Sequence, residues 1–509
     1  MPTPGLVSLV GAGPGAPGLL TLDGARRLAS ADVVLYDYLA SEALLDHTRE
    51  GVRLVCLGRH GEGKLWKQQE INERMVAESL AGHHVVRLKG GDPGVFGRLA
   101  EEIAACCEAG VPFEVIPGVT TAVAAGAFAG VTITDRDRAS CVAFVTGHER
   151  QGKQESEALD FGLLAKFPGT LVVYMGVTNA PEWSRKLIAG GKPADTPVLL
   201  VRRCSLPDQS MIDCTLGELP EVLAPQRVRP PLVAIIGQVA QREEAAQWFT
   251  GRPLFGQTVL VTRPSAQAKP TAQRLADLGA RVLLQPVIET TDPKDLAAVD
   301  DAIGRLGDFD WLAFSSRNGI DFFLRRLHQL GHDARALGRV KLAAIGPATA
   351  DALADWRLNT DLTPEEYRAE ALAERLQAEA SGKRVLLVRA SRGREVLAEQ
   401  LTAAGSQVEQ VVAYQSEDVA AADDAILEEI AAGRVDWITV TSSAIARSVV
   451  RLFGDAIATA PTPPKLAAIS PLTAEALLGE GAAAGCVAET YTSDGLIDAI
   501  VKARRGESG

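Results

Sequence analysis

The stretch that decides the fold of the first half is LVSLVGAGPGAPG, residues 6–18. The apolar run at 6–10 predicts a buried strand, and the glycines after it let the backbone approach a ligand closely. Similar runs at 33–36, 85–88, 143–146, 171–174 and 198–201 alternate with helical stretches such as 70–81 and 100–109. This alternation predicts an α/β fold with largely parallel sheets and with ligand sites at the strand ends.

Composition excludes several classes of protein. The formal net charge of −12 argues against a general nucleic-acid binder, which needs a surplus of Lys and Arg. The first residues lack a basic signal-peptide region, and the longest weakly polar stretch, 120–134, is shorter than the roughly 20 residues of a membrane span. Neither cysteines nor histidines show metal-ligand spacing. We therefore expect a cytoplasmic protein with no metal site.

The first glycine loop also fits a dinucleotide-binding motif. GAGPGA, residues 11–16, matches G-x-G-x-x-A, and Asp32 and Asp37 lie about where an acidic residue that binds the ribose is expected. In such sites a helix opens within the motif and faces the pyrophosphate. Here Pro14 and Pro17 occupy that turn, and the first N-cap candidate is Thr21. The motif thus disfavours an NAD(P)-dependent enzyme, which stays open as an alternative.

Two further glycine loops follow predicted strands. GRHGEGK, residues 58–64, matches the phosphate-binding G-x-x-x-x-G-K, but Leu65 stands where a magnesium-binding hydroxyl is required. LKGGDP, residues 88–93, places two glycines at a strand end and adds Asp92, an acceptor suited to an ammonium group. The second loop is the better candidate for a ligand site.

The second half starts after the break WFTGRPLFG, residues 248–256, and contains a repeat. VLVTRP from Val259 resembles VLLVRA from Val385. DWLAFSS at 310–316 resembles DWITVTS at 436–442, and KLAAIGPATA from Lys341 resembles KLAAISPLTA from Lys465. The near-constant spacing of these blocks predicts two similar doubly wound lobes. We expect domains at 1–250 and 257–503, the second with lobes at 257–287 plus 416–503 and at 292–411.

The order of motifs in the first half resembles the uroporphyrinogen-III C-methyltransferases. The motifs are GAGPG, YD at 36–37, VVRLKGGDP, PGVTTA from Pro117, VTGH from Val145 and VYMG from Val173. The resemblance implies the two-lobed tetrapyrrole methylase fold, S-adenosylmethionine as co-substrate, Asp37 as general base and a homodimer through this half. It implies a cofactor site of Pro14, Gly90, Gly91, Asp92, Val95, Thr120, Thr121, Met175 and Cys204.

The chain departs from this family at three places. Arg59 replaces a family lysine; because arginine stays protonated, it keeps a charge-stabilising role and not a proton-donor role. Where the family has a Glu-Asn-Gly segment that contacts the cofactor, this chain has Arg202-Arg203-Cys204. We expect this segment to contact the cofactor through its backbone groups alone. Thr134-Asp135-Arg136 replaces T-H-R. Related methyltransferases of the cobalamin pathway share GAGPG and GGDP, so the motifs specify the reaction type more closely than the substrate.

The repeat in the second half resembles uroporphyrinogen-III synthase. The resemblance implies a flavodoxin-like fold of two lobes joined by a two-stranded ladder, which we expect at 283–289 and 409–415. It implies hydroxymethylbilane as substrate, with Tyr414 assisting departure of its hydroxyl group. Side chains at strand ends are the candidates for contacts to this tetrapyrrole: Arg263, Ser315, Ser316, Asn318, Thr349, Arg389, Thr441, Ser442, Ser443 and Thr473.

These resemblances predict a bifunctional enzyme that makes uroporphyrinogen III and then methylates it to precorrin-2, for sirohaem or cobalamin synthesis. One alternative is a methyltransferase whose second half is an inactive binding module, because the synthase motifs are weak. The NAD(P)-dependent enzyme is the other.

Overall fold

Two structural units make up the chain. In the computed structural model, which describes residues 3–58, 66–149, 158–224, 228–366, 368–392 and 395–506, unit 1 is Met1–Gln257 with Ala276–Arg281. Unit 2 is Thr258–Leu275 with Val282–Gly509. No helix within the described ranges is both long and apolar enough to cross a membrane.

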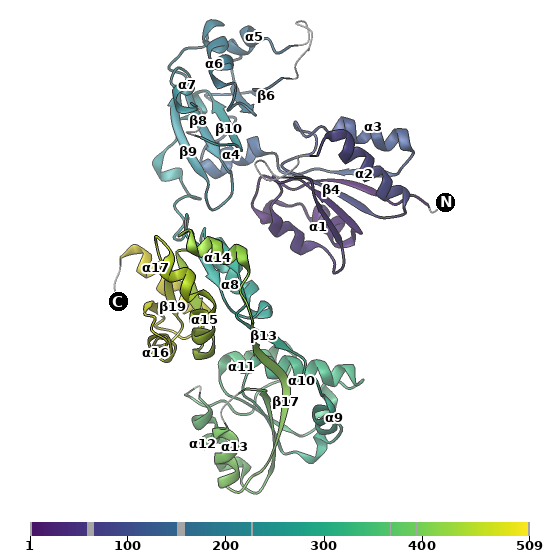
Figure 1. Ribbon diagram of the computed structural model, residues 1–509, viewed down its shortest axis with the longest axis vertical. Helices are drawn as coiled ribbons and strands as arrows, with labels where there is room; N and C mark the ends of the chain where they lie inside the picture. The colour runs from purple at the N-terminus through teal and green to yellow at the C-terminus, as the bar shows by residue number, and fades with distance from the viewer. Residues whose placement is uncertain are drawn as a thin grey trace. The chain divides into compact units, whose positions relative to one another are not determined.

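The first sheet of unit 1 is parallel and has the strand order β3-β2-β4-β1-β5. Its strands are β1 (Val7–Gly11), β2 (Val33–Tyr36), β3 (Arg53–Cys56), β4 (Val85–Lys89) and β5 (Phe113–Ile116). Helix α1 (Leu22–Ser30) packs on one face, and α2 (Gln68–Leu80) and α3 (Leu99–Ala109) pack on the other (Figure 1). Because the strands are parallel, the loops after β1, β2, β4 and β5 lie at one edge of the sheet.

The second sheet of unit 1 corrects the expectation of largely parallel sheets. Its order is β6-β7-β10-β8-β9, and only the β6–β7 pair of these neighbours is parallel. The seven-residue connection between β8 and β9 is too short for the crossover that parallel neighbours need. The strands are β6 (Val142–Thr146), β7 (Thr170–Tyr174), β8 (Pro197–Arg202), β9 (Ser210–Thr215) and β10 (Leu232–Ile236). The helices are α4 (Thr121–Ala129), α5 (Phe161–Ala165), α6 (Ala180–Ala189) and α7 (Leu219–Val222).

Unit 2 contains two lobes whose sheets share one plan. The first sheet, β12-β11-β18-β19-β20, consists of β11 (Thr258–Val261), β12 (Arg281–Leu284), β18 (Trp437–Val440), β19 (Lys465–Ala468) and β20 (Ala484–Val487). The second, β13-β17-β16-β14-β15, consists of β13 (Ile288–Thr291), β14 (Trp311–Phe314), β15 (Lys341–Ala344), β16 (Arg384–Ala390) and β17 (Gln407–Asp418). Trp311 and Trp437 are buried at the start of equivalent strands, as the repeat predicts.

Helices cover both sheets of unit 2. The first lobe carries α8 (Ser265–Asp277), α14 (Asp424–Ala431), α15 (Ser443–Thr459), α16 (Pro471–Gly479) and α17 (Ser493–Arg505). The second carries α9 (Ala297–Gly304), α10 (Arg317–Gln329), α11 (Pro347–Asp355), α12 (Ala369–Ala380) and α13 (Val396–Ala403).

The ladder between these two lobes lies further along the chain than the sequence suggested. The antiparallel pairs run from Ile288 opposite Asp418 to Thr291 opposite Gln415. Residues 409–412, expected in the ladder, instead pair in parallel with β16, and β12 belongs to the other sheet. The long strand β17 serves both pairings, and Figure 1 shows it with β13 between the lobes of unit 2.

Candidate active sites

Three loops at the edge of the first sheet contact one another through their backbones. The Gly13 amide donates to the Gly91 carbonyl at 3.1 Å, and the Gly91 amide donates to the Gly13 carbonyl at 2.8 Å. A Cβ placed on Gly118 would lie 2.4 Å from the Gly91 oxygen and 2.8 Å from the Gly11 Cα. Glycine is therefore required where the loops after β1, β4 and β5 meet.

Gly11 and Gly118 were missed as site residues in the sequence. The signal was present, because Pro117-Gly118 follows an apolar strand just as the other two glycine loops do. The predicted Gly90, Gly91 and Pro14 lie in these loops, beside the two missed glycines.

Asp92 connects two of these loops. Its Oδ1 accepts from the Gly94 amide at 2.8 Å, and its Oδ2 accepts from the Gly118 amide at 3.0 Å. The Val95 amide donates to the Asp92 carbonyl at 3.2 Å. The sequence predicted Asp92 as an acceptor for a ligand; the structure adds a role in holding the loop after β4 against the loop after β5.

The loops of the first sheet also contact the second sheet of unit 1. The Tyr174 hydroxyl lies 2.7 Å from Thr120 Oγ1 and accepts from the Ala122 amide at 2.7 Å. Met175, the next residue, is half-exposed and has a φ of 51°. Thr121 begins α4, with its Oγ1 3.6 Å from a Cβ placed on Gly91. Thr120, Thr121 and Met175 thus lie around the place where the glycine loops meet.

Cys204 belongs to the loop between β8 and β9. The neighbouring Ser205 hydroxyl accepts from the Ala16 amide at 2.9 Å, which places this loop beside the first glycine loop. Burial raises the pKa of the Cys204 thiol to about 12, so it stays protonated. That the Arg202-Arg203-Cys204 segment offers backbone groups to a cofactor stays a prediction.

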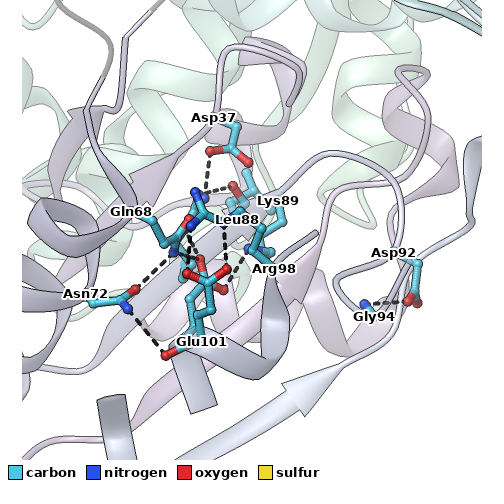
Figure 2. Close-up of polar contacts among 11 residues, drawn as sticks. Asp37, Gln68, Asn72, Leu88, Lys89, Asp92, Gly94, Arg98 and Glu101 are labelled. Atoms are coloured by element: carbon cyan, nitrogen blue, oxygen red, sulfur yellow. Dashed lines mark hydrogen bonds and ion pairs between the residues drawn. The ribbon is translucent and has the colours of Figure 1, made fainter. Parts of the chain in front are cut away.

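Asp37 follows β2 at the same edge and is held by a buried arginine. Arg87 Nη2 donates to Asp37 Oδ1 at 2.7 Å, and Arg87 Nε donates to Glu102 Oε1 at 3.1 Å. Lys89 Nζ donates to Glu102 Oε2 at 2.7 Å. Figure 2 shows these contacts around the labelled Asp37 and Lys89. The predicted Arg59 lies outside the described residues.

The site suits S-adenosylmethionine better than a dinucleotide. Helix α1 begins only at Leu22, capped by Thr21, and a short 3-10 helix, Pro17–Leu19, separates it from the glycine loop. The loop therefore does not open into a helix that could face a pyrophosphate. The Asp92 carboxylate among these loops disfavours a phosphate and suits the ammonium group of an amino-acid nucleoside.

In unit 2, two of the predicted substrate contacts cap helices. Ser316 Oγ accepts from the Gly319 amide at 3.1 Å, and Ser442 Oγ accepts from the Ile445 amide at 3.2 Å. Thr349 and Thr473 are buried in the first turns of α11 and α16. Helix capping therefore explains why Ser316 and Ser442 recur at equivalent positions of both lobes. Contacts of these residues with a substrate, and those of Thr441 and Ser443, stay predictions.

Tyr414 lies beside a pocket of about 240 Å³ in the second lobe. Its hydroxyl is 3.0 Å from Ser316 Oγ, and its ring stacks on Phe322 with centroids 5.4 Å apart. Burial raises the pKa of the Tyr414 phenol, so the neutral hydroxyl keeps a proton to donate. Other residues that line this pocket are Ser315, Arg389, Arg392 and Gln410.

Two further predicted residues are joined across the lobes of unit 2. Arg263 Nη2 donates to Gln267 Oε1 at 2.9 Å, and Gln267 Nε2 donates to Asn318 Oδ1 at 2.8 Å. Gln267, on α8, was not a sequence candidate. Arg389, at the end of the equivalent strand, contacts Glu395 and Gln410, so one carboxylate already balances its charge.

Comparison with known proteins gives the expected family for each half of the chain. A family model described as Tetrapyrrole (Corrin/Porphyrin) Methylases matches residues 6–220, and one described as Uroporphyrinogen-III synthase HemD matches residues 269–498. "Porphyrin biosynthesis protein HemD" of Ruminiclostridium josui is 33% identical over 455 residues, covering 89% of each chain. The uroporphyrinogen-III C-methyltransferase of Bacillus subtilis is 36% identical and covers 67% of this chain and 69% of its own.

Other relatives match the first half. The siroheme synthase of Zymomonas mobilis is 43% identical, and the match covers 49% of this chain and 52% of that relative. Among solved structures, uroporphyrin-III C-methyl transferase from Thermus thermophilus with S-adenyl homocysteine is 40% identical. It covers 46% of this chain and 98% of its own, with a TM-score of 0.40.

The two families matched, one per half, define an enzyme of tetrapyrrole biosynthesis. The relative matched over 89% of its length shows the same arrangement in one chain. The chain belongs to the family in which a uroporphyrinogen-III C-methyltransferase is fused to a uroporphyrinogen-III synthase.

Proposed function

We propose that unit 2 cyclises hydroxymethylbilane to uroporphyrinogen III with inversion of ring D. We further propose that unit 1 methylates this product twice to give precorrin-2. The observation that carries the methylation is the Asp37 carboxylate, held by Arg87 at the edge where the three glycine loops meet. A homodimer through unit 1 remains a prediction.

The methylation needs few side chains. When bound, S-adenosylmethionine supplies an electrophilic methyl group. Pro14, Gly90, Gly91, Thr120 and Thr121 would hold it in line with a pyrrolic carbon and exclude water. The Asp37 carboxylate takes the proton that the macrocycle loses as its double bonds rearrange.

The cyclisation depends on folding a flexible substrate, since the uncatalysed closure gives the wrong isomer. In unit 2, Tyr414 donates its proton to the departing hydroxyl group, and the neighbouring Ser316 orients the phenol. Arg263 and Arg389 lie at the ends of equivalent strands, where they would bind carboxylates of the tetrapyrrole.

Ligand binding tests the choice of cofactor. S-adenosylhomocysteine at about 100 times its Kd should stabilise unit 1 by about 2.7 kcal/mol, because a ligand of the native state stabilises it by mass action. The measurement is differential scanning calorimetry of the full chain with S-adenosylhomocysteine or with NADH. A shift with NADH alone would identify an NAD(P)-dependent enzyme instead.

The synthase activity is tested by supplying hydroxymethylbilane without S-adenosylmethionine. We expect the type III isomer, and we expect Tyr414→Phe to lower its rate of formation roughly tenfold, the cost of one lost hydrogen bond to the leaving group. This variant keeps the ring that stacks on Phe322. The exposed Tyr491→Phe serves as its control.

Chromatography of the isomers reads out the result. If the wild-type chain gives only the spontaneous type I isomer, unit 2 is an inactive binding module. If Tyr414→Phe matches Tyr491→Phe in rate, Tyr414 has a packing role and no part in the chemistry.

A further inference from the structure

A cluster of ions is buried behind Asp37 in unit 1. The side chain of Glu102, on α3, is 0% exposed, and those of Arg87 and Lys89, on β4, are each 3% exposed. Both Glu102 oxygens are occupied, Oε1 by Arg87 Nε at 3.1 Å and Oε2 by Lys89 Nζ at 2.7 Å. Gln68, on α2, is the third donor to the carboxylate, with its Nε2 3.1 Å from Oε1 (Figure 2).

The cluster reaches the surface of unit 1 at Asp37, whose side chain is 28% exposed. With Asp37 included, the formal charges are two cations and two carboxylates, so the group is neutral as a whole. Arg87 links the two carboxylates, because its Nε donates to Glu102 and its Nη2 donates to Asp37. Its Nη1 also donates to the Leu88 carbonyl at 3.1 Å, which fixes the plane of the fork.

Stability alone does not account for such a cluster. Removing charges from water costs several kcal/mol for each ion, and well-packed apolar residues are often as stable or more so. What the cluster does provide is orientation. A planar guanidinium held at two of its nitrogens, Nε by Glu102 and Nη1 by the Leu88 carbonyl, can present Nη2 to Asp37 in only one direction.

We propose that Glu102 is a positioning residue for methylation, which fixes Arg87 and through it the Asp37 carboxylate. This inference rests on the proposed role of Asp37 as the base. Lys89 donates to Oε2 of Glu102 while Arg87 donates to Oε1. With both oxygens bound, the Glu102 carboxylate does not turn away from Arg87. Glu102 itself is buried and touches neither cofactor nor macrocycle.

A double-mutant cycle in the full chain tests this inference. The variants are Glu102→Gln, Asp37→Asn and the two together, with uroporphyrinogen III and S-adenosylmethionine supplied. Alone, Glu102→Gln should lower kcat roughly tenfold with KM changed less than about twofold, because a small misplacement of the base slows the reaction and not binding. In the Asp37→Asn background, it should lower kcat less than about twofold. Glu108→Gln, an exposed charge change on the same helix, is the control.

The outcomes separate this inference from the proposed function. If Glu102→Gln lowers kcat by the same factor in both backgrounds, Glu102 is structural and the positioning role is wrong. If Asp37→Asn leaves turnover unchanged, the proposed base is wrong, and the positioning role fails with it.

Folding of the variants is a separate question, because Glu102→Gln leaves an unbalanced buried cation. The double change Glu102→Gln with Lys89→Met restores neutrality, since it removes one carboxylate and one cation. If Glu102→Gln does not fold, this pair replaces it in the cycle, and the expectation is the same. A full tenfold loss in the Asp37→Asn background would again overturn the inference.

Discussion

Replacing Asp37 by asparagine is expected to lower the turnover of methylation roughly 10²–10⁴-fold, the range typical of a lost general base. The amide has nearly the same shape but cannot take a proton. Its oxygen can still accept from Arg87, so the loop should keep its conformation. The measurement is a steady-state methylation assay with uroporphyrinogen III supplied. Asp46→Asn, an exposed aspartate of the same lobe, is the control.

Two further measurements show whether the effect of Asp37→Asn is chemical. Calorimetric titration should give an unchanged affinity for S-adenosylhomocysteine, because the cofactor loops do not depend on the Asp37 charge. Conversion of hydroxymethylbilane should also be unchanged, because we propose that unit 2 catalyses that reaction. Wild-type methylation in this variant would make Asp37 a structural residue at a strand end.

Replacing Gly118 by alanine is expected to weaken S-adenosylhomocysteine binding roughly 100-fold. The new Cβ would lie 2.4 Å from the Gly91 carbonyl oxygen and 2.8 Å from the Gly11 Cα, both of them backbone atoms. The loops must then move apart, and overpacking of this kind costs about 1–3 kcal/mol. At 1.4 kcal/mol for each factor of ten in Kd, the upper part of that range gives about 100-fold.

Gly18→Ala is the matched control for Gly118→Ala. Gly18 is exposed in the same unit, and a Cβ there meets no atom within 4 Å. Calorimetry of both variants gives the affinity, and circular dichroism checks that they are folded. Equal affinity for the two folded variants would show that the three loops do not form the cofactor site.

The strand ends were predictable because each is marked by a local pattern. An apolar run followed by glycine gives β1 at Val7–Gly11 and β4 at Val85–Lys89, within one residue of the expected bounds. Thr21 was identified as a helix N-cap, and its hydroxyl accepts from the Gly24 amide at 3.1 Å. Parallel order then places the marked loops at one edge, which is why most of the cofactor candidates lie together.

Contacts between distant segments were not predictable in this way. Arg87 and Lys89 look like interruptions of an apolar strand until Glu102, on a separate helix, is brought against them. The ladder of unit 2 was misplaced because 407–418 is one continuous strand, and only its register decides which part pairs with β16 and which with β13. The recurrence of Ser316 and Ser442 in both lobes could indicate a ligand site or helix capping, and capping accounts for it without a ligand.

The split lobe of unit 2 sets an order of events during protein synthesis. Its strand β11 begins the unit, yet its partner β18 follows only at Trp437, after the whole second lobe has been made. A pairing so distant in sequence closes slowly, and chains fold from the N-terminus as they are synthesised. We therefore expect the sheets of unit 1 and then the inserted lobe to form while the edge of β11 that pairs with β18 is still open. The lobe of unit 2 that is built from both ends of its sequence is thus expected to complete its sheet last.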